Sequence, residues 1–243
     1  MRTFVLFMGA ICFVVPALLL VADALPPKKS TSNSPSSSVN AEPNADASPS
    51  VDTTPVLTLQ NQWDSEACNP GLTLSAEGLI AAYTGNNTGF RSVFAKKAIP
   101  NRESGIFYFE VKISPRTDEN GEIVQPLTSG YVHIGFATKE MPLKKAVGLY
   151  EGAYAYESTG SVTGLRLHKP FGANDIVGCG INLKDRIVFY TKNGEHFATT
   201  KLSDNVTVDQ LFPCVSLHNT GSKIEANFKL NGFKFDIKNG FRK

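Results

Sequence analysis

Apolar and polar residues alternate along several short stretches of the chain, the pattern expected of half-buried β-strands. In residues 105–113, the letters GIFYFEVKI place four apolar side chains on one face and Tyr108, Glu110 and Lys112 on the other. We predict that the first face is buried and that the second faces water. The four inward residues are Phe107, Phe109, Val111 and Ile113.

A hairpin is predicted in residues 185–197, which read DRIVFYTKNGEHF. Asn193 and Gly194 both tolerate the positive φ that a two-residue type I′ turn requires, and apolar residues flank them on both sides. The strand before this turn carries apolar residues on both faces, which is typical of a strand inside a sheet. We therefore place that strand in the interior of a sheet and not at its edge.

The same two-residue period recurs in residues 132–136 and 223–228. Between such stretches lie Gly, Pro, Asn and Asp, and no stretch holds a helical apolar repeat longer than about two turns. The chain is therefore predicted to be all-β, with two packed antiparallel sheets forming a β-sandwich.

The N-terminal segment has the pattern of an export signal. Arg2 gives it a positive start, residues 4–22 are uncharged and mostly apolar, and Ala22-Asp23-Ala24 is a small-x-small cleavage pattern. We predict that residues 1–24 are a signal peptide removed after Ala24. The alternative is a membrane anchor, since a bilayer is spanned by about 20 apolar residues. Pro16 and the cleavage pattern favour removal.

Residues 25–55 differ in composition from the rest of the chain. They hold six of the fourteen prolines and eight serines, without an aromatic residue. Such a segment buries too little apolar surface to offset the entropy lost on ordering. We predict a disordered Pro/Ser-rich linker, followed by a single folded domain at residues 56–241.

The net charge of the chain argues against two kinds of partner, nucleic acids and anionic membranes. The chain has a net charge of +2, and removing residues 1–24 takes away one base and one acid and leaves this value unchanged. A nucleic-acid binder shows a basic stripe or patch, and a polybasic segment attracts anionic lipid. Neither is visible, so we expect no nucleic-acid partner and no stable membrane association once the signal is removed.

The cysteines give no disulfide framework. Cys12 lies in the signal, which leaves Cys68, Cys179 and Cys214, an odd number without close spacing. Two readings stay open: three free thiols with Cys179 buried in a strand, or one bridge and one leftover thiol. In both cases the domain is long enough to fold without a disulfide framework, so it can fold in a reducing compartment.

Catalytic motifs are missing from the sequence. It holds no Gly-x-Ser-x-Gly elbow, phosphate-binding glycine loop, His-Glu-x-x-His or Cys-x-x-Cys, and the four histidines are scattered. We predict that the protein is not an enzyme, with no catalytic residues, no cofactor and no metal site.

Six blocks of the sequence resemble the SPRY domain, of the type found in Ran-binding proteins. They stand in the family's order and span nearly all of residues 56–241. The blocks are SVFAKKAIPNRESGIFYFEVKI (92–113), YVHIGFA (131–137), YAYESTG (154–160), DIVGCGINL (175–183), IVFYTKNG (187–194) and LFPCVSL (211–217).

The combination of a signal peptide and a SPRY domain resembles the domain arrangement of the SPRYSEC family. These proteins are the secreted SPRY-domain effectors of plant-parasitic cyst nematodes. The resemblance implies secretion, delivery to the host cell cytoplasm or nucleus, and non-catalytic binding of host proteins. Those partners include plant resistance and immune signalling proteins, and the outcome is modulation of plant immunity. This would explain an exported chain that tolerates a reducing compartment.

In SPRY domains the ligand surface is formed by loops at one end of the sandwich, which implies four loops here: residues 84–91, 114–130, 139–154 and 218–221. Aromatic residues and arginine dominate the energetics of protein interfaces. On that basis six residues in or beside these loops are the protein-binding candidates. They are Arg91, Leu149, Tyr150, Tyr154, His218 and Asn219.

Two sequons, at Asn86 and Asn205, are possible N-glycosylation sites for a secreted chain. Together with the signal they keep a second hypothesis open, an extracellular lectin-like β-sandwich that binds glycans. Asn86 lies in a predicted binding loop, where a glycan would block a protein partner.

Overall fold

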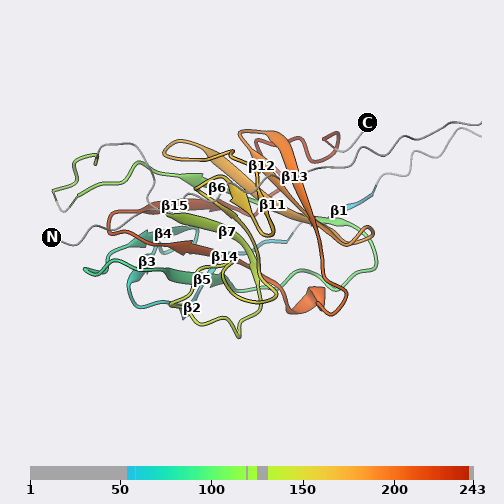
Figure 1. Ribbon diagram of the computed structural model, residues 1–243, viewed down its shortest axis with the longest axis horizontal. Helices are drawn as coiled ribbons and strands as arrows, with labels where there is room; N and C mark the ends of the chain where they lie inside the picture. Colours follow the sequence, from blue (N-terminus) through green and yellow to red (C-terminus); the bar gives the residue numbers. More distant parts are fainter. Residues whose placement is uncertain (1–53, 58, 119, 125–130, 241–243) are drawn as a thin grey trace, which may run out of the picture. The chain divides into compact units, whose positions relative to one another are not determined.

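The computed structural model describes residues 54–57, 59–118, 120–124 and 131–240, which form two β-sheets packed face to face (Figure 1). The all-β antiparallel sandwich predicted from the sequence is confirmed. The predicted signal peptide and residues 25–53 of the predicted linker lie outside the described residues. At the start of the fold, Ile106 N donates a hydrogen bond to Pro55 O at 2.9 Å.

The first sheet, sheet A, has eight strands among the described residues. Its order is β13 (Glu195–Lys201), β12 (Ile187–Lys192), β11 (Ile176–Asn182), β6 (Ile106–Ile113), β15 (Lys223–Asn227), β4 (Ile80–Tyr83) and β3 (Leu72–Leu74). The short β1 (Val56–Leu57) pairs with β6 in parallel, and the other pairs are antiparallel. The C-terminal strand β15 therefore lies inside sheet A, between β6 and β4.

The second sheet, sheet B, has seven antiparallel strands in the described part of the chain. Its order is β10 (Leu165–Arg166), β9 (Ser161–Val162), β8 (Tyr154–Glu157), β7 (Val132–Ala137), β14 (Phe212–Leu217), β5 (Arg91–Ala95) and β2 (Trp63–Cys68). A short 3-10 helix, η1 (Val208–Gln210), precedes β14. None of the described helices is long and apolar enough to cross a membrane.

The main core lies between the two sheets and contains the predicted inward residues of β6, β7 and β15. Phe109 is fully buried at its centre. Its ring stacks on Phe228 at a centroid distance of 5.5 Å and meets Phe136 edge-on at 5.6 Å. Trp63 contacts both Phe109 and Phe228 edge-on. Aromatic burial of this extent is the main stabilising contribution to the sandwich.

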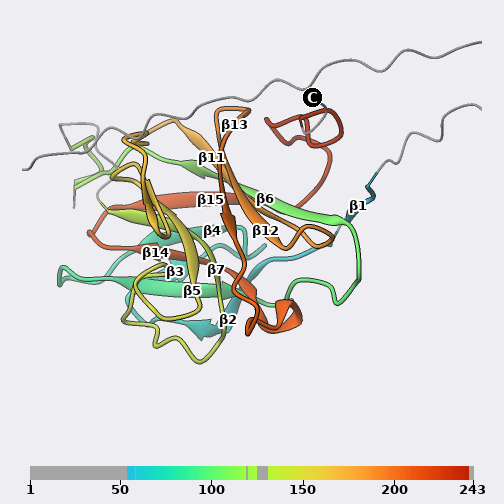
Figure 2. The same cartoon turned by 45° about the vertical axis from the view of Figure 1, so that its right-hand side comes forward.

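The outer face of sheet A differs from the prediction, which had Tyr108 and Glu110 facing water. Both are buried, at 2% and 3% exposure, because the chain after β15 folds back over this face. Phe235 and Ile237 of that segment pack with Tyr108 and Phe189 in a second apolar cluster. Figure 2 shows the dark red segment after β15 turning back toward the strands of sheet A. We name residues 228–240 the C-terminal strap.

The outer face of sheet B is covered by residues 138–153, the connection between β7 and β8. Met141 and Val147 of this connection pack on Phe94 and Cys214, whose side chains point away from the main core. Val147 N donates a hydrogen bond to Ser216 Oγ at 2.9 Å. Both sheets are thus buried on two sides over much of their area.

The predicted hairpin is present as β12 and β13. Asn193 and Gly194 have φ of 52° and 88°, as a type I′ turn requires. β12 lies between β11 and β13, so its predicted position inside a sheet is confirmed.

The three described cysteines are free thiols, which decides between the two readings of the sequence. Burial raises the pKa of Cys179 and Cys214 well above the usual range. Burial, with the charge of Asp64, raises the pKa of Cys68 to about 11. These thiols therefore stay protonated at neutral pH and are poor nucleophiles and metal ligands.

Candidate functional site: a loop rim at one end of the sandwich

Strand register determines which loops meet. In sheet B, β7 pairs with β14 so that Val132 lies opposite Leu217 at one end and Ala137 lies opposite Phe212 at the other. The five residue steps from Val132 to Ala137 span about 17 Å. The loops that lead into β5 and β7 and the loop that leaves β14 therefore lie at the same end, on the left in Figure 1.

Backbone hydrogen bonds join these loops. Gly89 N donates to His218 O at 3.0 Å, and Gly221 N donates to Tyr83 O at 3.1 Å. Thr117 N donates to Gly221 O at 3.4 Å. We name the joined surface the loop rim; it comprises residues 84–91, 114–118, 120–124, 131 and 218–222. Three of the four predicted loops thus come together in their described parts.

An aromatic cluster lies beneath the loop rim. The Phe90 ring is 4.8 Å from both the His133 and the His218 rings, edge-on in each case. Tyr131 contacts His218 edge-on at 5.5 Å. Edge-to-face packing at these distances stabilises aromatic pairs beyond the area they bury. The cluster therefore gives the loops a rigid base.

Two apolar side chains are exposed at the loop rim: Tyr131, which packs on the aromatic cluster, and Ile123, which forms a β-bridge with Thr117. Tyr131 and Ile123 are each 53% exposed. The centres of protein interfaces are enriched in aromatic and apolar side chains that lose contact with water on binding. An exposed tyrosine on a rigid base is suited to binding another protein.

The structure places three of the six candidates at the loop rim. Arg91 lies half-buried at its edge, with its guanidinium carbon 5.9 Å from the centre of the Tyr83 ring and Nη1 donating to Phe90 O at 2.9 Å. The ring nitrogen of His218 lies 3.3 Å from Asn219 Oδ1, and both residues are half-buried. In the free protein Arg91 and His218 therefore organise the loops more than they project from them.

The other candidates lie elsewhere. Leu149, 62% exposed, belongs to the connection over the outer face of sheet B. Tyr154 lies opposite Phe136, near the end of β7 that is away from the loop rim, and Tyr150 lines the same pocket as Tyr154. The six candidates therefore do not lie on one surface, and the prediction that they do is wrong. The physical reason is that residues 138–153 leave β7 at Ala137 and enter β8 at Tyr154, both at the end of sheet B away from the loop rim.

The two possible glycosylation sites lie at opposite ends. Asn86 is exposed in the loop that precedes β5, within the loop rim. Asn205 is exposed in the segment before η1 and lines the same pocket as Tyr150 and Tyr154.

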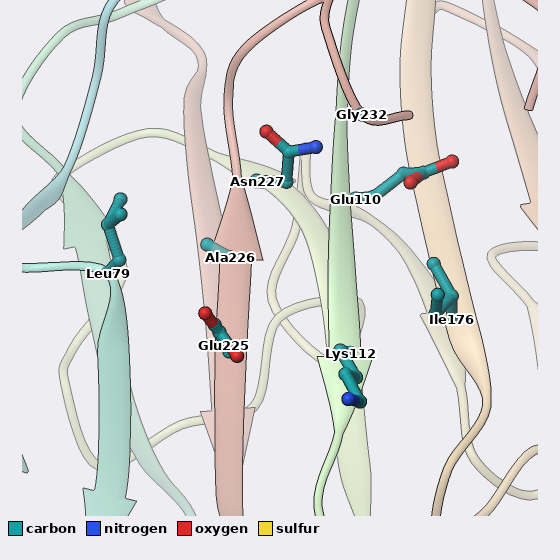
Figure 3. A pocket seen from close by; sticks show the side chains of 8 residues that line it. All are labelled: Leu79, Glu110, Lys112, Ile176, Glu225, Ala226, Asn227 and Gly232. Carbon is teal, nitrogen blue, oxygen red and sulfur yellow. The ribbon is translucent and has the colours of Figure 1, made fainter. Parts of the chain in front are cut away.

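A separate pocket lies on the outer face of sheet A (Figure 3). Its labelled side chains include Glu110 and Lys112 of β6 and Glu225 of β15. Lys112 and Glu225 are opposite each other in the strand register, a favourable cross-strand charge arrangement. Both oxygens of Glu110 accept hydrogen bonds from within the protein. The buried charge of this pocket is thus already satisfied, which makes the pocket a weak candidate.

The described residues contain no group of three or more His, Cys, Asp or Glu side chains arranged to hold a metal ion. At the loop rim the buried histidine, His133, is held by Val147 O, 3.0 Å from its Nδ1, which fixes the ring.

His133 predicts a dependence of stability on pH. Burial lowers its pKa, and the nearby His218 lowers it further, against the opposing effects of Val147 O and Glu157. A histidine in the unfolded chain takes up a proton near pH 6.5, whereas the folded protein keeps His133 neutral. The unfolded state then binds more protons, so the free energy of unfolding falls as the pH drops below about 7, by up to about 1.4 kcal/mol per pH unit.

Urea unfolding at pH 7.5, 6.5 and 5.5 measures this effect. His133→Asn keeps an N–H donor for Val147 O and removes the titrating group, so its unfolding free energy should vary less over this range. Equal pH dependence in both proteins would rule out His133 as the source.

Sequence reasoning missed the most exposed part of the loop rim. Tyr131 was assigned to the strand block that begins with it, although β7 begins one residue later, at Val132. Phe90 and Ile123 lay in predicted loops but were not selected. The available signal was their apolar character within otherwise polar loops.

Comparison with known proteins agrees with this architecture. The sequence model of the SPRY domain matches residues 106–231, and the chain belongs to the SPRY domain family. SPRY domains are protein-interaction modules and typically non-catalytic.

Among individual proteins, the chain is similar to Ran-binding protein 9 of Homo sapiens, at 31% identity over 195 residues, covering 76% of this chain and 25% of that protein. Ran-binding protein 10 of Danio rerio is 32% identical over 190 residues, covering 74% of this chain and 29% of that protein. The chain thus spans about a quarter of the length of the curated relatives it matches.

A solved structure shares the fold. The crystal structure of a human SPRY domain aligns with a TM-score of 0.50 at 21% identity, covering 65% of this chain and 95% of that one. The similarity to Ran-binding proteins 9 and 10 confirms the expected relation to Ran-binding-type SPRY domains.

Proposed function

We propose that the protein is a secreted effector that binds host proteins through the loop rim, without catalysis, and so modulates plant immune signalling. The observation that carries the binding role is the exposure of two apolar side chains at the loop rim, Tyr131 on the aromatic cluster and Ile123 in the loop that Thr117 joins to Gly221. Their side chains are each 53% exposed, whereas most large apolar side chains of the described domain are buried.

Secretion and delivery to the host cytoplasm or nucleus rest on two features. The pattern of residues 1–24 supports export, and N-terminal sequencing of chain secreted from cultured cells would show whether it begins at Leu25. The three free thiols support work in a reducing compartment, because disulfides do not persist there.

The test is expression of residues 25–243 in plant cytosol, followed by quantitative identification of co-purified proteins. Tyr131→Ser with Ile123→Ser should lower recovery of a direct partner by about thirtyfold, since a hot spot contributes about 2 kcal/mol or more. Both side chains are exposed, so thermal unfolding should change little.

Leu165→Ser with Leu167→Ser is the matched control. These leucines are 48% and 37% exposed and lie outside the loop rim, so their replacement removes apolar surface of the same kind elsewhere. Equal recovery of the partner by both double variants would refute binding through the loop rim. Binding of glycans in place of a protein partner would favour the extracellular lectin-like alternative.

A further inference from the structure

A second concave surface lies away from the loop rim. It is a pocket of about 460 Å³ between the end of the β7–β8 connection and the segment that precedes η1. Tyr150 comes from this connection, Tyr154 is the first residue of β8, and Ser203 and Asn205 come from the segment before η1. The two tyrosines that the sequence suggested for binding thus meet here and not at the loop rim.

The charged side chains that line this pocket are all acidic. Glu140 and Glu151 are its charged lining residues, and the lining includes no Lys, Arg or His. Both side chains are exposed, and no ion pair or hydrogen bond of either carboxylate occurs within the described part of the chain. Two carboxylates without a counterion at the mouth of one pocket attract a cation from a partner.

The tyrosines add a flat apolar wall and an unused donor. Tyr154 is 5% exposed, and its hydroxyl oxygen accepts a hydrogen bond from Ser203 N at 2.8 Å. No hydrogen bond donated by its own O–H occurs among the residues that the structure describes. Because Tyr154 lines the pocket, this O–H is available to donate to a ligand carbonyl. The half-buried Tyr150 borders the same space.

We propose that this pocket binds an arginine side chain of a partner polypeptide. The guanidinium fork pairs with carboxylates in two parallel hydrogen bonds and stacks on aromatic faces, which suits Glu140, Glu151 and the Tyr150 ring. A backbone carbonyl of the same partner accepts the hydrogen bond from Tyr154. The binding goes beyond the proposed use of the loop rim and does not depend on it.

Whether this pocket is open depends on glycosylation of Asn205, and therefore on the compartment in which the chain is made. The residue is exposed, lines the pocket and begins a sequon. A glycan attached there during export would fill the space in front of Glu151 and Tyr150. Only chain with an unmodified Asn205 presents the open pocket.

The experiment is an NMR titration of isotopically labelled chain from residue 25 onward, made in bacterial cytosol and therefore unglycosylated. The probes are acetyl-Gly-Arg-Gly-amide and its Lys and Gln counterparts. The arginine peptide should shift the backbone amide signals of Gly152, Ala153 and Asn205 in a saturable manner. The lysine peptide should bind more weakly, and the glutamine peptide should leave these signals unchanged.

Matched variants separate the pocket from general charge effects. Glu140→Gln with Glu151→Gln should weaken binding of the arginine peptide by about tenfold. Glu66→Gln with Glu103→Gln makes the same charge change at exposed positions elsewhere and should leave binding unchanged. The Tyr131 and Ile123 double variant should also bind the peptide normally, which distinguishes failure of this pocket from failure of the loop rim.

Three outcomes would overturn the proposal: no shift of the pocket amides by the arginine peptide, equal binding by the Glu140 and Glu151 variant, or equal binding of the lysine peptide. Shifts of these amides by a neutral oligosaccharide, without shifts by the arginine peptide, would assign the pocket to glycans instead.

Discussion

Replacing Phe109 by Ala should lower the free energy of unfolding by about 3 to 5 kcal/mol, and replacing it by Asp should prevent folding. Phe109 is fully buried, and its ring contacts Phe228, Phe136 and Trp63. Small domains are stable by only about 5 to 15 kcal/mol, so the Ala variant loses a large part of the total. The Asp variant would bury an unpaired carboxylate in the same place.

Urea unfolding measures the Ala variant, and near-ultraviolet circular dichroism together with solubility measures the Asp variant. Phe197→Ala is the control, because Phe197 is half-buried on β13 at the edge of sheet A. It should cost clearly less than Phe109→Ala. A soluble Asp variant with an unchanged dichroism spectrum would contradict the inward orientation of this face of β6.

Replacing Glu110 by Ala should destabilise the protein by about 1 to 5 kcal/mol, because it leaves one buried and one partly buried backbone N–H group without acceptors, at about 1 to 3 kcal/mol for the buried group and less for the other. Lys234 N donates to Glu110 Oε2 at 2.8 Å, and Phe235 N donates to Oε1 at 2.9 Å. The Tyr108 hydroxyl also donates to Oε1, at 2.8 Å. Glu110 thus holds the C-terminal strap to sheet A.

Amide hydrogen exchange tests this role directly. The amides of Lys234 and Phe235 should exchange much faster in Glu110→Ala, since the strap loses its anchor. A chain ending at Gly232 provides the second arm of a double-mutant cycle. In this shortened chain, which lacks Lys234 and Phe235, Glu110→Ala should cost far less, because the two backbone N–H groups that Glu110 accepts from are absent. Unchanged exchange at Phe235, or fully additive losses, would show that Glu110 stabilises the fold by another route.

Local pattern was enough to predict the inward residues of β6, the position of β12 inside a sheet and the type of the turn at Asn193. Each of these depends on neighbouring residues in the sequence and on the two-residue period of a strand. The SPRY fold followed because several such patterns stood in the order of the family.

The burial of Glu110 could not be predicted in this way. The groups that bind it, Lys234 N and Phe235 N, lie 124 and 125 residues further along the chain. The alternation of polar and apolar residues in β6 is the same whether the outer face meets water or the strap. Only the tertiary structure distinguishes the two.

The candidate site was predicted only in part for a related reason. Sequence indicates that residues 139–154 connect two strands but not which path they follow. They leave β7 and enter β8 at the end of sheet B away from the loop rim, which separates Tyr150 and Tyr154 from Arg91, His218 and Asn219. The prominence of Tyr131 depends on the exposure of one residue at a strand end, which a strand pattern does not determine.

The position of β15 has a consequence for synthesis on the ribosome. β15 fills the place between β6 and β4, so both strands wait for a partner that is translated more than a hundred residues after either of them. Such distant pairing makes folding slow and leaves apolar strand edges open on the nascent chain. Sheet A can therefore be completed only when β15 has left the exit tunnel.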